Sequence, residues 1–493
     1  METFQCLTLF LLFISTVFIL KRKFSHKPNL PPSPPKLPIL GNFHQLGTLV
    51  HRAVTVLAAK YGPLMLLHFG KTPVLIVSSQ ETAKEIMKTH DLALANRPLT
   101  TAARALLYDC TDISFAPYGE YWREMKKMAV LNLLSIKKIQ SFRSVREELA
   151  SDMIKEITRL SKTGAPVDVT NMLYHFSEDL LFRCTLGFKP KGQHKFQKLS
   201  RDFLDLVGAF CFNDFFPGMA WMDALTGLNR KLKKGSRELD DFVDELIEER
   251  IAMVKDGVEP NEFLDLLLHT HRDTTQEIKL TRDNVKAIIL DTFLGGIDLP
   301  ASVMEWAMAE LMRNPSKMKI AQEEVRKVVG NKNKVDEDDV YQMNFLKSAV
   351  KETLRLHPPA PLLFARESYT SINVENYIIP PYTSVMINIW HIQRDPKLWD
   401  KAEEFIPERF MNSGIDYKSH DYEFIPFGSG RRGCPGMSFG VAAVEFAVAN
   451  LLYWFDWKFV GDTTPETLDM TEDYCFALFK KKPLHFIPIS RSS

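Results

Sequence analysis

The sequence of 493 residues lacks the marks of several protein classes. Its six cysteines are far apart and form no CxxC pair, which argues against a disulfide framework and against a structural zinc site. A formal net charge of +1 gives no signal for a nucleic-acid partner. Beyond residue 48 there is no Ser/Gly-rich linker, charge block or internal repeat, so 49–493 is expected to fold as one large domain. Two closely packed lobes remain an alternative.

A long apolar run occurs at the N-terminus, over residues 3–20, and three basic residues, 21–23, follow it. About 20 apolar residues span a bilayer. A cleaved signal peptide is the alternative, but the charges follow the run and no small-residue cleavage site appears. We therefore expect residues 1–23 to be an N-terminal transmembrane helix that places the body in the cytoplasm. Residues 24–48 are rich in proline and are expected to form a stiff hinge.

The body is predicted to be mainly α with a minor β region. Two short apolar runs flank a Gly-Lys-Thr turn and predict paired strands at 63–69 and 73–78. Helical periodicity and further short strands follow along the chain. The expected helices cover 140–160, 229–254, 283–313 and 315–329, and the further strands lie near 374–379, 383–389 and 474–488.

One predicted helix contains residues that oppose helix formation. Residues 281–313 would make a helix about 45–50 Å long at 1.5 Å per residue, long enough to cross the domain. Gly295, Gly296 and Pro300 lie near its middle, and these residue types weaken a helix interior most. The sequence therefore predicts a break in a core helix.

A single cysteine, Cys434, lies in a glycine-rich bend that leads into an apolar helix. Pro435 suits the first helical position. A helix N-terminus lowers the pKa of a thiol, and one thiolate can serve as the protein ligand of haem iron. The alternative is a buried structural cysteine in a turn. The spacing of Phe427, Gly430, Arg432 and Gly436 around Cys434 favours a flat cofactor.

Three motifs in order carry a family resemblance. The loop FGSGRRGCPG, the helix KETLRLHPPAPL with Glu352 and Arg355, and PERF with Arg409 resemble those of cytochrome P450. The chain is similar to plant microsomal A-type members, those of clan seventy-one. The resemblance implies the P450 fold, haem b with Cys434 as axial ligand, and O2 as co-substrate. It also implies NADPH–cytochrome P450 reductase as electron donor, an apolar small-molecule substrate and the endoplasmic reticulum membrane as location.

The same resemblance assigns cations to the haem propionates. It implies that Arg432, Arg366 and the helix of Trp122 contact them, with Lys126 where the family has arginine. Lysine lacks the bidentate fork of arginine, and a solvated helix face is the alternative for Lys126. Glu352, Arg355 and Arg409 are expected to brace the segment before the loop. Residues 97–118, 205–220 and 362–365 are expected to wall the substrate pocket.

The resemblance fails at one point of the long helix. The family has an acid followed by threonine and a second hydroxyl residue, whereas this chain has Asp298, Leu299 and Pro300. The family threonine helps to deliver protons. Here we expect them to come from Ser302, from a water held by the carbonyl of Gly296, or from a substrate group. Asp298, Leu299, Pro300 and Ser302 are therefore the candidate catalytic positions.

The expected function is oxidation of a terpenoid, alkaloid, coumarin or other phenylpropanoid, with ring formation or rearrangement as well as hydroxylation among the outcomes. Two alternatives remain. A reductase-independent haem-thiolate isomerase or dehydratase would also lack the threonine, although the intact Cys434 loop argues against it. A haem-binding protein without catalysis is the other, and the predicted anchor argues against that.

Overall fold

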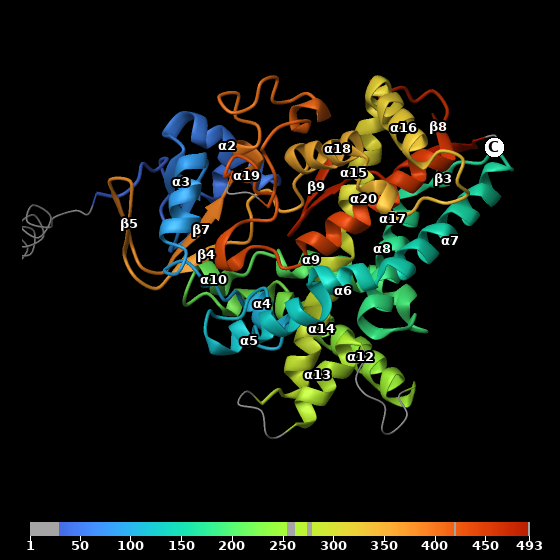
Figure 1. The fold of residues 1–493 in the computed structure, drawn as a ribbon. Coiled ribbons are helices and arrows are strands. Elements are labelled where there is room, and N and C mark those ends of the chain that lie inside the picture. The colour runs from blue at the N-terminus through green and yellow to red at the C-terminus, as the bar shows by residue number, and fades with distance from the viewer. Residues whose placement is uncertain (1–28, 254–261, 274–278, 419–420, 492–493) are drawn as a thin grey trace, which may run out of the picture.

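The computed structural model describes residues 29–253, 262–273, 279–418 and 421–491, and they form a mainly helical body with small sheets on opposite sides (Figure 1). The expected anchor, residues 1–23, lies outside the described residues. The helices are α2 (Val50–Tyr61), α3 (Gln80–Lys84), α4 (Thr101–Leu106), α5 (Glu120–Ala129), α6 (Ile136–Ser141), α7 (Arg143–Ser161), α8 (Val169–Leu186), α9 (Phe196–Val207), α10 (Phe212–Phe215), α11 (Trp221–Leu225), α12 (Leu228–Met253), α13 (Phe263–Arg272), α14 (Arg282–Gly296), α15 (Asp298–Arg313), α16 (Pro315–Val329), α17 (Glu337–Val340), α18 (Asn344–Leu356), α19 (Ile389–Ile392) and α20 (Met437–Trp454). The helices expected from periodicity are confirmed, and the stretch 283–313 contains the break that was expected in it.

The sheets confirm the expected hairpin near the N-terminus. Strands β1 and β2 pair antiparallel with Leu64 opposite Val77, and β2 pairs parallel with β7, which carries β4 at its other edge. The strands are β1 (Leu64–Phe69), β2 (Thr72–Val77), β3 (Val167–Asp168), β4 (Arg366–Ser368), β5 (Ile372–Val374), β6 (Tyr377–Ile379), β7 (Thr383–Ile387), β8 (Phe455–Phe459), β9 (Glu472–Tyr474), β10 (Leu478–Lys480) and β11 (His485–Ser490). The mixed sheet positions Arg366, which is the first residue of β4.

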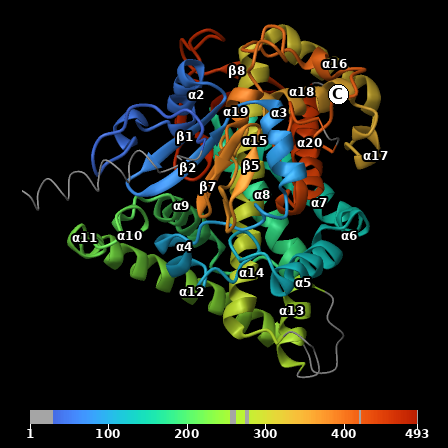
Figure 2. The ribbon, with the colours of Figure 1, turned by 90° about the vertical axis from the view of Figure 1, so that its left-hand side faces the viewer.

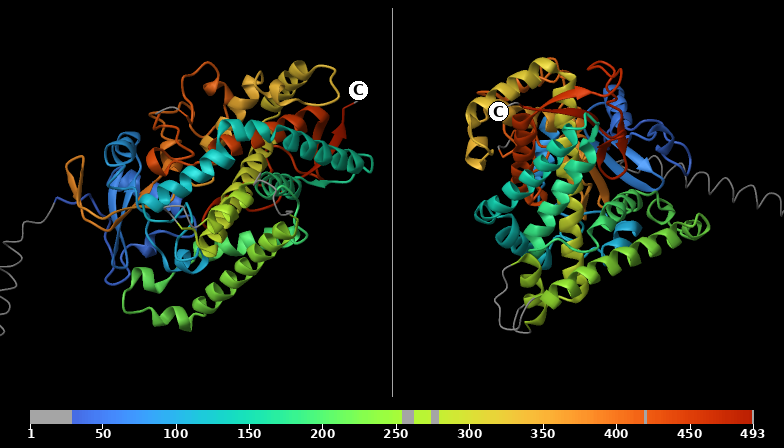
Figure 3. Two further views of the ribbon diagram at one scale, coloured as in Figure 1. Left: turned by 60° about the horizontal axis from the view of Figure 1, so that its bottom comes forward. Right: turned by 90° about the vertical axis from the view of Figure 1, so that its right-hand side faces the viewer.

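Helices α14 and α15 run through the middle of the body in succession (Figure 2). The helix is interrupted at Ile297, whose φ is −101° and ψ is −62°, although its N–H still donates to the Phe293 carbonyl at 3.1 Å and its carbonyl accepts from the Ala301 N–H at 3.3 Å. The break expected within 281–313 is therefore present, between α14 and α15. Helix α15 packs against α8, α18 and α20, and Trp306 on it is fully buried. Figure 3 shows the pair from two further sides, with α12 along the edge of the body.

Two described helical stretches, 282–313 and Met437–Trp454, are long and apolar enough to cross a membrane by length and composition. Their apolar windows are 72% and 67% buried inside the body, respectively. A core helix of a folded domain has these same properties. Their apolar character is therefore explained by their place in the core of the body.

The described part of the expected hinge lies on the body instead of standing free. The Leu66 N–H donates to the carbonyl of Pro32 at 2.9 Å, and the Ile378 N–H donates to that of Asn29 at 2.8 Å. The Asn42 side chain accepts from the His68 N–H at 2.8 Å. Residues from Asn29 onward therefore attach to the sheets, while the domain boundary at residue 49 stays a prediction.

Candidate active site

An internal cavity lies between the Cys434 loop and the helix break. Its volume is about 280 Å³. Cys434, Phe427 and Gly436 line it on one side, and Gly295, Gly296, Leu299, Pro300 and Val303 line it on the other. Cys434 is exposed, but toward this cavity and not toward bulk solvent. The sequence-predicted loop and the broken helix therefore face each other across one space.

Local geometry fixes the position of the Cys434 thiol. The Cys434 N–H donates to the Phe427 carbonyl at 2.9 Å, which closes the loop. Gly430 has a φ of +70°, and a Cβ there would lie 2.3 Å from the Asp91 carboxylate. Only glycine fits that turn without displacement. The loop is thus folded tightly against the segment that contains Asp91.

The expected low thiol pKa of Cys434 is not found. Burial raises its pKa, and this outweighs the lowering by the backbone N–H groups of Gly436 and Met437 and by the charge of Lys126. The helix N-terminus therefore acts in the expected direction but is weaker than desolvation. A metal ion at the sulfur would reverse the balance, because a coordinating thiol loses its proton.

Four cationic side chains line the same cavity, namely Arg97, Lys126, Arg366 and Arg432. Arg432 donates to the carbonyls of Ala95 at 2.6 Å and of Ala116 at 2.5 Å. Burial lowers the pKa of Arg432 to about 10, helped by the charge of Arg366. Burying several positive charges together lowers the stability of the fold unless an anion binds among them.

Trp122 supports two of these cations through its ring face. The guanidinium carbon of Arg432 lies 4.4 Å from the ring centroid, and the Lys126 Nζ lies 5.0 Å from it. The indole N–H donates to the Ile113 carbonyl at 2.8 Å. Lys126 donates to the Arg431 carbonyl at 2.6 Å and is not a solvated face residue. The Trp122 N–H was expected near a propionate, but it is already hydrogen-bonded to Ile113 within the protein.

Arg97 is a cation that the sequence interpretation missed, because its segment was assigned to the substrate roof. Its guanidinium donates to the carbonyls of Ser114, Phe364 and Ala365. Burial, and then the charges of Arg366 and Arg432, lower its pKa well below the usual range. The positive charge at the start of the assigned roof segment, 97–118, was the available signal.

The donor set fits a cofactor with two carboxylates. Arg366 forms an ion pair with Asp91 at 3.0 Å. Among the described residues, Arg97, Arg432 and Lys126 form no ion pair, although all three line the cavity. A thiol on the cavity wall and three nearby cations without an ion-pair partner match the needs of haem, whose iron takes a thiolate and whose propionates take cations.

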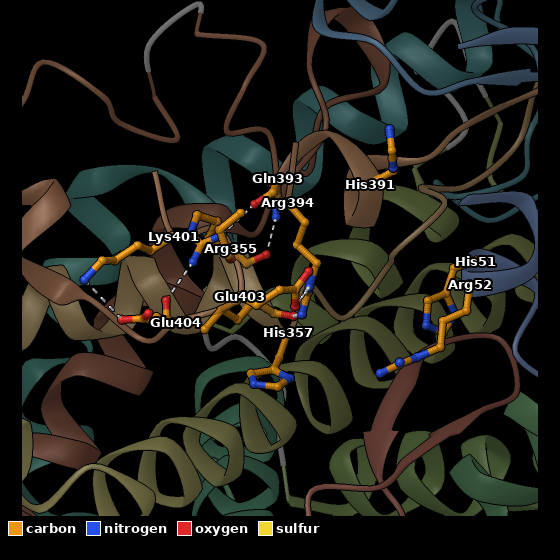
Figure 4. Close-up of polar contacts among 12 residues, drawn as sticks. His51, Arg52, Arg355, His357, His391, Gln393, Arg394, Lys401, Glu403 and Glu404 are labelled. Carbon is orange, nitrogen blue, oxygen red and sulfur yellow. Dashed lines mark hydrogen bonds and ion pairs between the residues drawn. The ribbon is translucent and has the colours of Figure 1, made fainter. Parts of the chain in front are cut away.

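The motif pair Glu352 and Arg355 forms a buried brace behind the loop. Arg355 donates to Glu352 at 2.7 and 2.8 Å, and its remaining N–H groups reach the carbonyls of Gln393 and Ala402, each at 2.7 Å. Arg409 joins through Glu352 at 3.0 Å. Figure 4 shows Arg355 between Gln393 and Glu404. Because both members of the central pair are fully buried, this is no surface ion pair.

Two candidate catalytic positions point away from the cavity. The Ser302 hydroxyl is buried and donates to the Leu478 carbonyl at 3.2 Å. Asp298 is buried against α9, where Ser200 lies 3.5 Å from its carboxylate, and burial raises its pKa to about 7. Neither residue belongs to the described lining of the cavity. The expectation that Ser302 supplies protons there is therefore wrong in this geometry.

The Gly296 carbonyl, expected to hold a water at the cavity, already has a hydrogen-bond partner on α8. The Ser177 hydroxyl lies 3.4 Å from it and donates to the Ile297 carbonyl at 2.9 Å. Gly296 packs on α8, where a Cβ would come within 2.6 Å of Leu181. Gly295 has open space around its Cβ position and is the glycine that leaves room in the cavity.

The expected pocket walls are partly correct. Leu363, Phe364, Arg97, Ile113 and Ser114 line the cavity. The described residues 205–220 are absent from its lining. Phe210, Phe215 and Phe216 there instead gather around Phe43, with ring centroids 5.1 to 6.2 Å away. They therefore tie the α10 region to the N-terminal segment.

Asp291 and Thr292 are polar lining residues that the sequence interpretation did not single out. The Ser114 hydroxyl donates to Asp291 at 2.5 Å. Burial raises the pKa of Asp291 to about 6. Their spacing from Gly295 on the predicted helix was the signal that would have placed them on the cavity side.

Known proteins of similar sequence cover nearly the whole chain. Cytochrome P450 71A1 of Persea americana is 50% identical over 455 residues, which cover 91% of this chain and 91% of that protein. A phenylacetaldehyde oxime monooxygenase of Prunus mume is 44% identical, covering 98% and 93%. A strychnine-11-hydroxylase of Strychnos nux-vomica is 42% identical, covering 95% and 94%.

Similar structures bear out the fold. A zebra fish cytochrome P450 solved with abiraterone covers 90% of this chain and 100% of its own, with a TM-score of 0.75 and 22% identity. The cytochrome P450 family model matches residues 31–487. Members of that family bind haem through an axial cysteine thiolate. The chain therefore belongs to the cytochrome P450 family, as a monooxygenase beside plant members of the CYP71 clan.

Proposed function

We propose that this P450 is anchored in the endoplasmic reticulum membrane by residues 1–23 and receives electrons from NADPH–cytochrome P450 reductase. Its substrate is an apolar plant specialised metabolite of the terpenoid, alkaloid, coumarin or other phenylpropanoid classes. The proposal rests on one observation: the Cys434 thiol lines a cavity whose wall also includes the helix break and three cations without an ion-pair partner. Relatives whose names specify an oxime monooxygenase and a strychnine hydroxylase support the substrate range.

The haem would be held by Cys434 at its iron and by Arg97, Arg366, Arg432 and Lys126 at its propionates. Trp122 would position Arg432 and Lys126 through its ring, since its N–H is bound to Ile113. Phe427 and Gly436 would form the loop surface beside the ligand. When bound, haem supplies activation of O2 and transfer of one oxygen atom to the substrate. The protein supplies orientation, charge and exclusion of water.

Leu299 and Pro300 present only carbon side chains to the cavity. With Ser302 and Asp298 turned away, the hydroxyl and carboxyl groups in the described lining are those of Ser114, Asp291 and Thr292. We assign proton supply to these groups with a bound water, or to a polar group of the substrate. This arrangement suits an oxidation that ends in ring formation or rearrangement as well as a hydroxylation.

The test of this assignment is Leu299→Thr combined with Pro300→Ser. The measurements are product formed per NADPH consumed and the pattern of products. A changed product pattern or coupling supports the assignment. A double variant that matches the parent in both would show that the replacement has no mechanistic role.

The test of the whole function uses membranes that contain this protein and the reductase. Candidate plant metabolites are added, and NADPH oxidation and products are followed. Substrate-dependent NADPH use with one oxygen atom from labelled O2 in the product is expected. A product formed without NADPH would instead support the reductase-independent isomerase or dehydratase. An unaltered membrane distribution after deletion of residues 1–23 would contradict the anchor.

A further inference from the structure

One buried carboxylate lies behind the wall of the cavity. Asp91 comes two residues after the helical turn Glu85–Thr89, and its side chain is 7% exposed. It is absent from the described lining, whereas its ion-pair partner Arg366 belongs to that lining. Asp91 can therefore act on a bound haem only through the residues that it holds and through its charge.

Asp91 holds a cation of the propionate site. The Arg366 guanidinium donates to Asp91 Oδ1 at 3.0 Å and to the Ser429 carbonyl at 2.7 Å. The Arg366 side chain is 4% exposed, so both members of the ion pair are buried. Among the described residues, no other acid forms an ion pair with Arg366. Because the loss of either partner leaves an uncompensated buried charge, the place of Arg366 in the cavity wall depends on Asp91.

The same carboxylate contacts the loop of Cys434. The Arg431 backbone N–H donates to both oxygens at 3.2 Å, and the Arg431 guanidinium donates to Oδ2 at 2.8 Å. A Cβ at Gly430 would lie 2.3 Å from Oδ1, so the turn packs directly on the carboxylate. The Arg431 side chain is 46% exposed, and an exposed ion pair stabilises a protein little. Asp91 therefore connects the propionate side of the cavity with the loop that contains the thiol.

Asp91 also offsets part of the positive charge around the cavity. Four cations line that cavity, and only Arg366 has an ion-pair partner among the described residues. The charge of Asp91 acts beyond this partner. Burial and then the charge of Arg432 lower the pKa of Lys126, whereas the charges of Cys434 and Asp91 oppose that lowering. Charges interact strongly where water is excluded, so the cations favour an added electron at the site and the Asp91 carboxylate opposes one.

We propose that Asp91 is a positioning residue that sets the reduction potential of the bound haem, by holding Arg366 at the propionate side and by placing one negative charge beside the site. When the reductase supplies one electron, the haem gains one unit of negative charge, and a nearby carboxylate disfavours that gain. Asp91 therefore keeps the haem harder to reduce than a neutral residue would. This inference rests on the proposed placement of the haem and goes beyond the proposed reaction, because it concerns the entry of electrons instead of the substrate.

The experiment is a redox titration of the haem-loaded full chain with mediator dyes, in which the haem absorption band reports the ratio of reduced to oxidised protein. Asp91→Asn keeps the shape and an oxygen acceptor for Arg366 but removes the charge. At a fixed solution potential, the ratio of reduced to oxidised protein is expected to rise by ~3- to ~10-fold in this variant, the effect of one buried charge near the site. A tenfold rise corresponds to a potential that is more positive by ~59 mV.

Three further variants isolate the charge. Asp91→Glu retains it, but the longer side chain meets the turn at Gly430, so this variant should lose stability while its ratio stays within about twofold of the parent. Asp223→Asn is the matched control, because Asp223 is a buried acid outside the described lining that accepts the N–H groups of Phe212 and Asn213 at 2.7 and 2.9 Å. It should lose stability and keep the parent ratio. Asp91→Ser also removes the charge and leaves an oxygen acceptor, and it replaces Asp91→Asn if that variant takes up no haem.

The outcomes separate this inference from the haem-thiolate function. A rise below about threefold in Asp91→Asn, or an equal rise in Asp91→Glu, overturns the assignment to the charge of Asp91. An equal rise in Asp223→Asn would assign the effect to the loss of any buried acid and would also overturn it. In all of these cases the parent keeps the thiolate signature of its carbon monoxide complex. Loss of that signature in the parent would instead overturn the haem-thiolate function.

Discussion

Pro300 provides a test of how the helix break is built. As a residue in the middle of a continuous helix, it would cost ~3 kcal/mol or more, because proline removes one hydrogen bond and its ring clashes with the preceding turn. The structure ends α14 at Gly296 and starts α15 at Asp298, so Pro300 is the third residue of a new helix. The first-turn N–H groups of a helix have no intrahelical partner, and proline is tolerated there.

The expected effect of Pro300→Ala follows from these positions. Alanine adds an N–H that can approach the Gly296 carbonyl, where the Ser177 hydroxyl already lies at 3.4 Å, so the gain is at most ~1 kcal/mol. The more flexible unfolded chain costs ~0.4–1 kcal/mol, and the lost ring carbons cost ~0.8 kcal/mol for each buried methylene. Alanine lacks two of the ring carbons, so the free energy of unfolding should be unchanged or fall by up to ~2.6 kcal/mol.

The assay is urea unfolding of the haem-loaded protein, followed by far-ultraviolet circular dichroism and by the haem band. Pro315→Ala is the matched control, because Pro315 is the first residue of α16 and is certainly in a first turn. Similar small effects of both variants are expected. A stabilisation of ~3 kcal/mol by Pro300→Ala alone would show that Pro300 strains a helix interior and would refute the break described here.

Three further predictions concern the brace, the helix glycines and a buried acid. Glu352→Gln should lower the free energy of unfolding by ~3–5 kcal/mol in urea unfolding, because it leaves the fully buried Arg355 charge without its partner; a loss below ~1 kcal/mol would contradict the brace. Gly296→Ala should lower thermal stability because its Cβ meets Leu181 at 2.6 Å, whereas Gly295→Ala should not, and equal effects would refute the packing difference. Asp298 has a pKa raised to about 7, so its ionisation opposes folding as pH rises from about 4, the usual aspartate value, to 7. Asp298→Asn should therefore gain stability relative to the parent over that range, and a pH-independent difference would contradict the raised pKa.

Local patterns made much of the fold predictable. The hairpin at 63–78 follows from two short apolar runs around a turn, and the core helices follow from their periodicity. The break near Gly295 was visible because glycine and proline oppose helices. Its exact form was not, since the choice between a kink and two separate helices depends on Ser177 and Leu181 of α8, which are distant in sequence.

The site was predictable where a motif fixes it and was less so elsewhere. Cys434, Arg366 and Arg432 lie in the cavity lining as expected. The direction in which Asp298 and Ser302 point depends on the rotation of α15 about its axis, which packing against α8 and α18 sets. The thiol pKa could not be inferred from a helix N-terminus alone, because the depth of burial decides it. The positions of Arg97 and Asp291 in the site could not be predicted, because they depend on neighbours that come from other segments of the chain.

The central claim is that Cys434 provides the axial thiolate of a haem bound in this cavity. The most direct measurement is the absorption spectrum of the reduced, carbon monoxide-bound protein for the parent and for Cys434→Ser. Cys110→Ser is the control, because Cys110 is a buried cysteine absent from the described lining of the cavity. The parent and Cys110→Ser are expected to show the red-shifted band of thiolate ligation, and Cys434→Ser is expected to lose it. Survival of that band in Cys434→Ser would contradict the account.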